Sequence, residues 1–135
     1  MPVLVSACLL GFPCRHDGRD KRDDRVLERL KDEEIVPICP EVAAGFGIPR
    51  QPAWHDGPRM MDALGADVTA QFDEGARKAV EAAQSHGVTL AILKQNSPSC
   101  GTRMTGTAQG RAPGRGRAAA ALVLAGIESR GEDEL

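Results

Sequence analysis

Four cysteines are the residues of this sequence whose chemistry most needs an explanation. They are Cys8, Cys14, Cys39 and Cys100, and no two of them form the C-x2-C pair that is common at structural zinc sites. The first residues carry no basic segment before their apolar run, so we predict no signal peptide and a cytoplasmic protein. In that compartment the thiols stay reduced, and disulfides do not account for them.

Three short apolar segments predict the strands that would position these cysteines. Each is rich in Val, Ile or Leu without alternation, which is typical of strands covered on both faces. They are residues 3–7, 35–38 and 88–93. Periodic apolar positions predict helices at 24–32, at about 70–86 with Thr69 as the N-cap, and at 117–125. The alternation predicts an α/β fold: a single doubly wound domain, residues 1–135, with a short parallel sheet.

Three of the cysteines lie where these strands end. Cys8 and Cys39 directly follow the first two strands, and Cys100 lies in the turn after the third. The carboxyl ends of parallel strands meet at one edge of a sheet, so the three thiols should converge there. Spacing alone leaves four alternatives: an iron–sulfur cluster with one open iron, a closed cluster with Cys14 as fourth ligand, zinc, or plain buried thiols.

Two segments carry no helix or strand pattern. Residues 40–64, rich in Pro and Gly, and residues 96–116, rich in Gly, Thr and Arg, are expected to be long irregular connections, which are usually functional. The second lies in an acid-free stretch between Glu81 and Glu128. Its arginines could clamp a phosphate, although a solvated loop is the interpretation we favour.

Composition sets the remaining bounds. The chain has 135 residues, 41% of them hydrophobic but only 3% aromatic, which predicts one aliphatic core. A net charge of −2 does not by itself indicate a nucleic-acid partner. The longest uninterrupted apolar stretch, residues 118–125, is far shorter than the roughly 20 residues of a membrane helix, so no membrane partner is expected.

Ordered motifs over residues 3 to about 127 resemble the thiouracil desulfurase family. They read VSACLLG with CRHDG, CPEV with PRQP, DVT, and ILK with SPSCG. The resemblance implies a 4Fe-4S cluster on Cys8, Cys39 and Cys100 that leaves one iron without a protein ligand. Cys14 matches another family cysteine and is an alternative ligand.

The same resemblance implies an enzyme that removes sulfur, without net redox change, from a thiolated pyrimidine such as 2-thiouracil or 2-thiouridine. The products are the oxo base and sulfide, and a thiolated nucleoside or tRNA is a further candidate substrate. Glu41 matches the catalytic carboxylate and Ser97 the active-site hydroxyl, whereas by residue type alone they are a solvated acid and a turn cap.

Two further residues are expected at the substrate. Lys94 could balance the negative charge of a thiolate-ligated cluster, and Ser99 lies in the same turn as Ser97. The alternative function is an iron–sulfur carrier or redox-sensing module without hydrolytic activity, for which Cys14 would be the fourth ligand.

Overall fold

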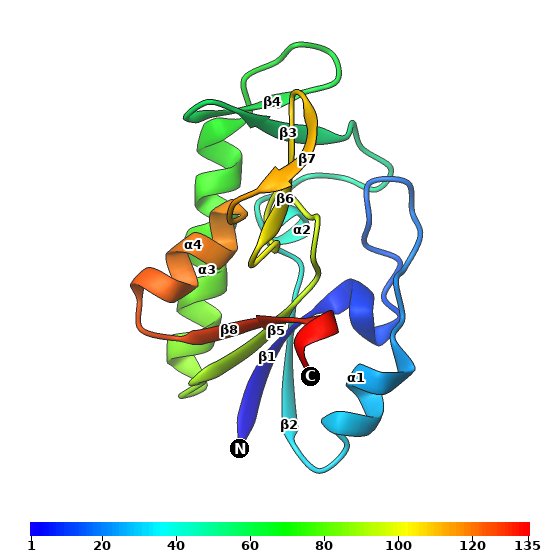
Figure 1. Cartoon of the computed structure of the whole chain (residues 1–135), viewed down its shortest axis with the longest axis vertical. Coiled ribbons are helices and arrows are strands. Elements are labelled where there is room, and N and C mark those ends of the chain that lie inside the picture. Colours follow the sequence, from blue (N-terminus) through cyan, green and yellow to red (C-terminus); the bar gives the residue numbers. More distant parts are fainter.

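A four-stranded parallel sheet forms the centre of the computed structural model, which describes residues 1–135 (Figure 1). Its strands lie in the order β2-β1-β5-β8. Their bounds are β1 (Pro2–Ser6), β2 (Glu34–Ile38), β5 (Leu90–Leu93) and β8 (Glu128–Gly131). The chain moves from β1 to one side and later returns to the other, so the winding direction reverses between β1 and β5. The predicted α/β fold is confirmed, with β8 as an additional edge strand.

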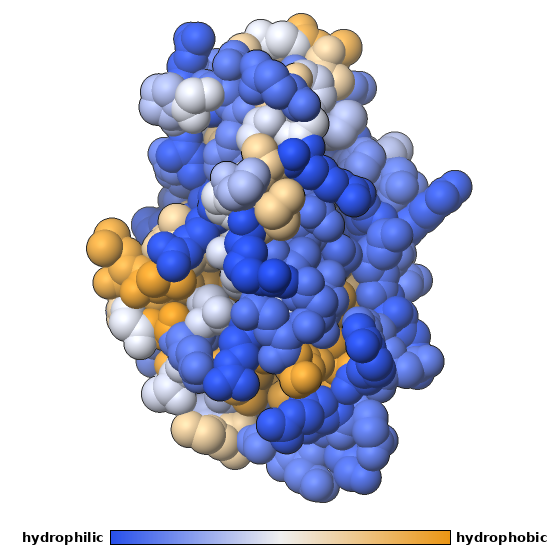
Figure 2. Space-filling model, viewed as in Figure 1, coloured by the Kyte–Doolittle hydropathy of each residue, from blue (hydrophilic) through white to orange (hydrophobic).

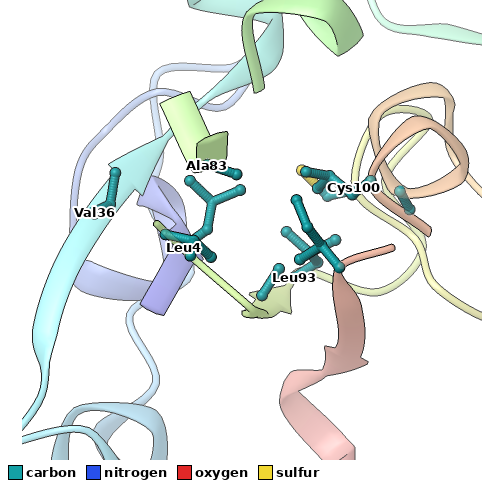
Figure 3. Close-up of a cluster of buried hydrophobic side chains, with 10 residues drawn as sticks. Leu4, Val36, Ala83, Leu93 and Cys100 are labelled. Carbon is teal, nitrogen blue, oxygen red and sulfur yellow. The ribbon is translucent and has the colours of Figure 1, made fainter. Parts of the chain in front are cut away.

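Helices cover both faces of this parallel sheet (Figure 1). Alternate strand residues Val3, Val5 and Ile92 pack with Val26 of α1 (Asp24–Arg29) on one face. On the other face lie α3 (Thr69–Ser85) and α4 (Arg117–Leu124). There Leu4 and Leu93 share a buried cluster with residues of both helices (Figure 3). The predicted periodicities therefore identified the three longest helices of the structure.

The helix boundaries differ from the predictions by one to three residues, most clearly at the end of α1 and at the start of α3. Helix α1 ends at Arg29 and not at residue 32, and Asp23 caps it by accepting hydrogen bonds from the N–H groups of Arg25 and Val26. Thr69 is the first residue of α3 and not its N-cap, because its hydroxyl accepts a hydrogen bond from the Met60 N–H at 2.8 Å. The Thr69 side chain therefore joins α3 to β4 (Arg59–Asp62) and does not cap the first turn of the helix.

A second, small sheet occupies the two segments that were expected to be irregular, so that expectation was wrong. Its order is β4-β3-β6-β7, two antiparallel hairpins joined in parallel at the register pair His55–Thr107. The strands are β3 (Ala53–Asp56), β4 (Arg59–Asp62), β6 (Met104–Thr107) and β7 (Gly110–Pro113). Strands of only four residues, in which apolar and polar side chains do not alternate regularly, leave no apolar period to detect.

The small sheet is fastened to α3 by a compact apolar contact. Met60 is fully buried against Val68 and Phe72, and the rings of Phe46 and Phe72 are 5.3 Å apart. Three short helical segments complete the structure: η1 (Ala7–Leu10), α2 (Pro40–Ala43) and η2 (Glu132–Glu134).

The face shown in Figure 2 is mostly hydrophilic, and its hydrophobic side chains gather mainly over α4, where Leu124 is 91% exposed. None of the helices combines the length and the apolar character needed to span a bilayer.

Candidate active site

All four cysteines line one cavity of about 290 Å³ at the carboxyl ends of β1, β2 and β5. Cys8 belongs to η1, directly after β1, and Cys39 directly follows β2. Cys100 lies in the turn after β5, and Cys14 reaches the cavity from the loop that follows η1. The cavity therefore occupies the place where the winding direction of the sheet reverses, which is the usual ligand site of such folds.

Tight packing positions Cys39 and the short helix α2 that follows it. Pro40 occupies the first turn of α2, where its missing N–H costs no hydrogen bond. Gly75 of α3 lies against this turn, and a Cβ atom there would stand 2.9 Å from the carbonyl carbon of Pro40. Only glycine allows α3 to approach so closely, so α3 holds the site without contributing to it chemically.

The turn that carries Cys100 is held by hydrogen bonds from both sides. The Ser97 hydroxyl oxygen accepts the N–H groups of Ser99 and Cys100 at 3.1 and 3.0 Å. The Ser99 carbonyl accepts the N–H groups of Ala118 and Ala119 in the first turn of α4. Ser97 therefore caps its turn and also lines the cavity.

The four thiols differ in how readily they ionise. Burial raises the pKa of Cys8 to about 11 and also raises the pKa of Cys100. A hydrogen bond between the side chains of Cys14 and Cys39 raises the pKa of Cys14 and lowers that of Cys39 to about 7. Cys39 is thus the thiol that ionises first in metal-free protein, and metal binding would displace the other protons.

Glu41 is held inside the site. Its carboxylate accepts hydrogen bonds from Arg50 Nε at 3.3 Å and Ser99 Oγ at 3.5 Å, and its side chain is 15% exposed. Arg50 also donates to the carbonyl of Cys14 at 2.8 Å, which ties the Cys14 loop to the carboxylate. Glu41 is therefore not a solvated loop acid. Arg50 belongs to the PRQP motif, but no local pattern marks its contacts with Glu41 and Cys14, because these partners are distant in the chain.

Of the two residues expected to contact the substrate, Lys94 lines the cavity and Ser99 does not. Lys94 lines it, but its ammonium group already pairs with Glu132 at 3.0 Å and donates to the Gln95 carbonyl at 2.8 Å. Ser99 is 2% exposed, does not line the cavity, and donates to Glu41. The structure therefore favours a contact of Ser99 with Glu41 over the expected direct contact with substrate. Glu132 gave no signal in the sequence beyond its negative charge.

Several cations of the cavity wall have no acidic partner. Arg15, Lys21 and Arg111 line the cavity without an ion pair, and Glu41 is the single carboxylate among the lining residues. Arg111 lies on β7 of the small sheet, in the stretch that was expected to be a solvated loop. The cavity therefore offers positive charge to a bound anion.

The donor set fits an iron–sulfur cluster better than a single metal ion. No three Cys, His, Asp or Glu side chains are gathered as the ligands of one ion. A tetrahedral zinc needs its ligands around one centre, whereas a cluster takes thiolates that stand further apart and come from distant segments. Three strand-end thiols with a fourth nearby meet that requirement.

Comparisons with known proteins agree with this geometry. A family model described as 2-thiouracil desulfurase matches residues 3–134. The uncharacterized protein YbbK of Bacillus subtilis (strain 168) is 36% identical, over 98% of this chain and 97% of the relative. A solved structure described as a 4Fe-4S-dependent thiouracil desulfidase, TudS, matches with a TM-score of 0.93 and 39% identity, over 99% of this chain and 92% of that chain. The chain belongs to the 2-thiouracil desulfurase family.

Proposed function

We propose that this protein is an enzyme that removes sulfur from a thiolated pyrimidine of the 2-thiouracil type. One water replaces the thione sulfur, so the products are the oxo base and hydrogen sulfide, and no electron is gained or lost. The observation that carries this proposal is the cavity in which Glu41 and the cysteines meet, in a chain of the 2-thiouracil desulfurase family. The similarity to a thiouracil desulfidase of known structure supports it.

Cys8, Cys39 and Cys100 are the residues that would hold a 4Fe-4S cluster with one iron free of protein ligands. They follow three neighbouring strands, whereas Cys14 lies on the loop after η1 and is the alternative ligand. When bound, such a cluster supplies a Lewis-acidic iron for the thione sulfur. The similarity to a 4Fe-4S-dependent protein supports this assignment.

Glu41 acts as the general base for the attacking water. Arg50 and Ser99 each bind one of its oxygens, which orients the carboxylate in a site that is largely shielded from solvent. Ser99 is accordingly a positioning residue for Glu41 in this mechanism.

Ser97 donates a hydrogen bond to the pyrimidine. Its oxygen already accepts two backbone N–H groups, so the hydroxyl proton is free to point into the cavity. A donor fixed in this way stabilises negative charge that develops on the ring as water adds. Lys94 contributes a paired cation at the same wall.

The unpaired cations favour a substrate that carries phosphate. Arg15, Lys21 and Arg111 line a cavity with a single carboxylate, and arginine is suited to binding phosphate oxygens. A thiolated nucleotide or a thiolated nucleoside within tRNA would place phosphate beside them, whereas free 2-thiouracil would not. We therefore extend the proposal from the free base to its phosphorylated forms.

Anaerobic reconstitution with iron and sulfide, followed by a sulfide assay, tests the proposed function. We expect brown protein with about four irons per chain and sulfide release from 2-thiouracil, 2-thiouridine or its 5′-monophosphate. Brown protein that releases no sulfide from any of them would instead support an iron–sulfur carrier or redox sensor. The contact between Cys14 and Cys39 favours that second candidate, because it brings a fourth thiol to the site.

A further inference from the structure

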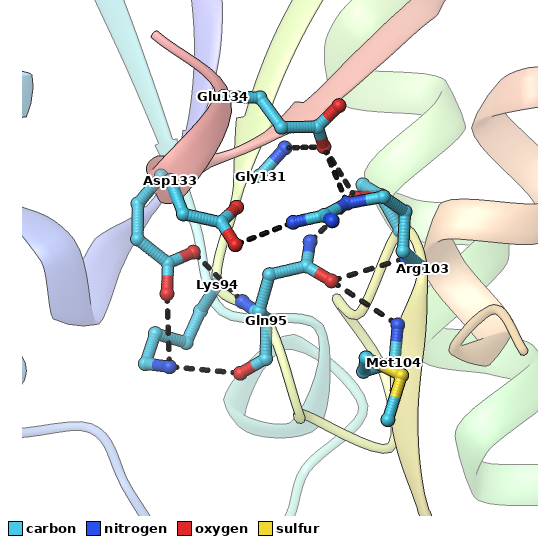
Figure 4. A network of polar contacts seen from close by, with 9 residues as sticks. Lys94, Gln95, Arg103, Met104, Gly131, Asp133 and Glu134 are labelled. Carbon is cyan, nitrogen blue, oxygen red and sulfur yellow. Dashed lines mark hydrogen bonds and ion pairs between the residues drawn. The ribbon is translucent and has the colours of Figure 1, made fainter. Parts of the chain in front are cut away.

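The acidic C-terminal segment lies against the active-site cavity wall. It forms η2 (Glu132–Glu134), directly after the edge strand β8. Figure 4 shows its carboxylates directed toward the segment that leaves β5, residues 94–103, which includes Ser97 and Cys100. Residues that follow the last strand are thus in contact with both ends of the segment that carries Cys100.

Glu132 binds the beginning of segment 94–103. One carboxylate oxygen pairs with Lys94 Nζ at 3.0 Å, and the other accepts the Gln95 N–H at 2.8 Å. The side chains of Lys94 and Glu132 are only 19% and 14% exposed. A pair shielded to this degree is screened less by solvent than a surface pair, and both hydrogen bonds fix its geometry.

Glu134 binds the end of the same segment. Its carboxylate accepts hydrogen bonds from Arg103 Nε at 3.1 Å, Thr102 Oγ1 at 3.3 Å and the Gly131 N–H at 2.9 Å. Asp133 adds an ion pair to the other side of Arg103. These groups are more exposed than the Lys94–Glu132 pair, so we expect them to contribute less.

Gln95 fills the space between the two ends. It is 5% exposed, and its amide oxygen accepts the N–H groups of Arg103 and Met104 at 3.0 and 3.2 Å. Gly131 leaves the room that Gln95 needs, because a Cβ atom there would stand 2.8 Å from Gln95 Cγ. The segment is thus closed on itself through a buried amide, with η2 packed against it.

We propose that Glu132 is a positioning residue of the active site, whose carboxylate holds Lys94 and Gln95 at the cavity wall. The inference rests on the proposed function, because it takes this cavity to be the site of desulfuration. Glu41 is the single carboxylate that lines the cavity. Without Glu132, the ammonium group of Lys94 would keep only its hydrogen bond to the Gln95 carbonyl and would lose its counter-charge, so it would compete for Glu41.

The variant Glu132→Gln tests this role, because the amide keeps the volume and a hydrogen bond to the Gln95 N–H but removes the charge. We expect acetylation of Lys94 in metal-free protein, followed by mass spectrometry, to become about fivefold faster. We also expect kcat for sulfide release to fall about tenfold, with unchanged iron content. In the double variant Glu132→Gln with Lys94→Met, kcat should equal that of Lys94→Met alone.

Glu128→Gln is the matched control. Glu128 belongs to β8 and pairs with Arg130 on the exposed surface, so neither acetylation of Lys94 nor kcat should change. Two results would overturn the proposal. One is an unchanged rate of Lys94 acetylation in Glu132→Gln, and the other is a kcat of the double variant that shows the separate effects of Glu132→Gln and Lys94→Met added together. If wild-type protein releases no sulfide, the proposed function fails, whereas the acetylation comparison still decides whether Glu132 holds Lys94.

Discussion

The parallel sheet and the small sheet contribute different parts of the candidate active site. The parallel sheet ends in the three cysteines Cys8, Cys39 and Cys100, whereas the small sheet and its flanks contribute cavity-lining residues without thiols. These are Pro52, Ala53, Gly106 and Arg111. Under the proposed function, the ends of the parallel sheet would hold the cluster, and the small sheet would add a phosphate contact at Arg111.

The two sheets also differ in how they are stabilised. Leu4 and Val5 of the parallel sheet are fully buried, one toward each face. The small sheet is joined to the rest by the buried side chain of Met60 and by hydrogen bonds of its strands, among them those of Met104, whose N–H donates to Gln95, and of His55, whose Nε2 lies 3.1 Å from the Pro98 carbonyl. That last contact connects the small sheet to the turn of Cys100. The small sheet can therefore vary in its exposed residues while the cysteines keep their places.

Loss of a strand-end cysteine is expected to have the largest effect. Cys8→Ser, Cys39→Ser and Cys100→Ser should each abolish iron binding after anaerobic reconstitution, because a cluster held by three thiolates cannot keep its geometry on two. Cys14→Ser should retain the iron, measured by metal analysis and by the visible absorption of the cluster. Iron loss in Cys14→Ser equal to that in the other three would contradict the division between strand-end thiols and the loop thiol.

Substitution of the base should abolish turnover but not the cluster. In Glu41→Gln, kcat should fall roughly 10²- to 10⁴-fold, the range for loss of a general base. Iron content should match the wild type, since Glu41 is assigned to the water and not to the metal. The measurement is sulfide release under saturating substrate, with Glu81→Gln, an exposed acid of α3, as the control. Full activity of Glu41→Gln would remove Glu41 from the mechanism.

The Cys14–Cys39 contact predicts a pH-dependent thiol in metal-free protein. The hydrogen bond from Cys14 lowers the pKa of Cys39 to about 7, so Cys39 should be alkylated first and more slowly as the pH falls below 7. Burial raises the pKa of Cys8 to about 11, so that thiol should react much more slowly. Cys14→Ala should slow Cys39 alkylation at pH 7 about tenfold. Mass spectrometry of iodoacetamide-treated protein gives both rates, and equal rates for Cys39 and Cys8 would refute the assignment.

A change in the small sheet should have the mildest effect. Arg111→Ala should raise KM for a thiolated nucleoside 5′-monophosphate several-fold to tenfold, the loss expected for one exposed phosphate contact. Its kcat and its iron content should stay near the wild-type values. The KM for free 2-thiouracil should not change, because that base has no phosphate. A parallel rise in both KM values would show that Arg111 acts on the base or on the cavity shape.

The apolar strands were predictable because each depends on its own residues. Residues 3–5 form a continuous apolar run that is buried on both faces of the sheet. Residues 35–38 are also apolar, but β2 lies at the edge of the sheet and Val36 is its one buried residue. Strand β8 has the sequence ESRG, and one of its four residues is buried, so no local pattern marks it. It forms because β5 offers an unpaired edge, which is a property of the assembled sheet.

The part of the site that depends on strand direction, the meeting of three cysteines at one sheet edge, was predictable from the sequence. Parallel strands place their carboxyl ends together, so the positions of Cys8, Cys39 and Cys100 in the chain were sufficient to expect one shared edge. The partners of Glu41 and Lys94 were not predictable in this way. Arg50 bonds to a carbonyl 36 residues away, and Glu132 pairs with a lysine 38 residues away.

The amino-acid sequence by itself determined the α/β class, the strand-end thiols and the motifs of the family, because these depend on local residue types and their order. Only the tertiary structure decided that Ser99 lies behind Glu41, that Arg50 joins Glu41 to the Cys14 loop, and that Lys94 is paired with Glu132. Such pairs depend on which side chains of distant segments meet in a shielded place, and that is settled by packing.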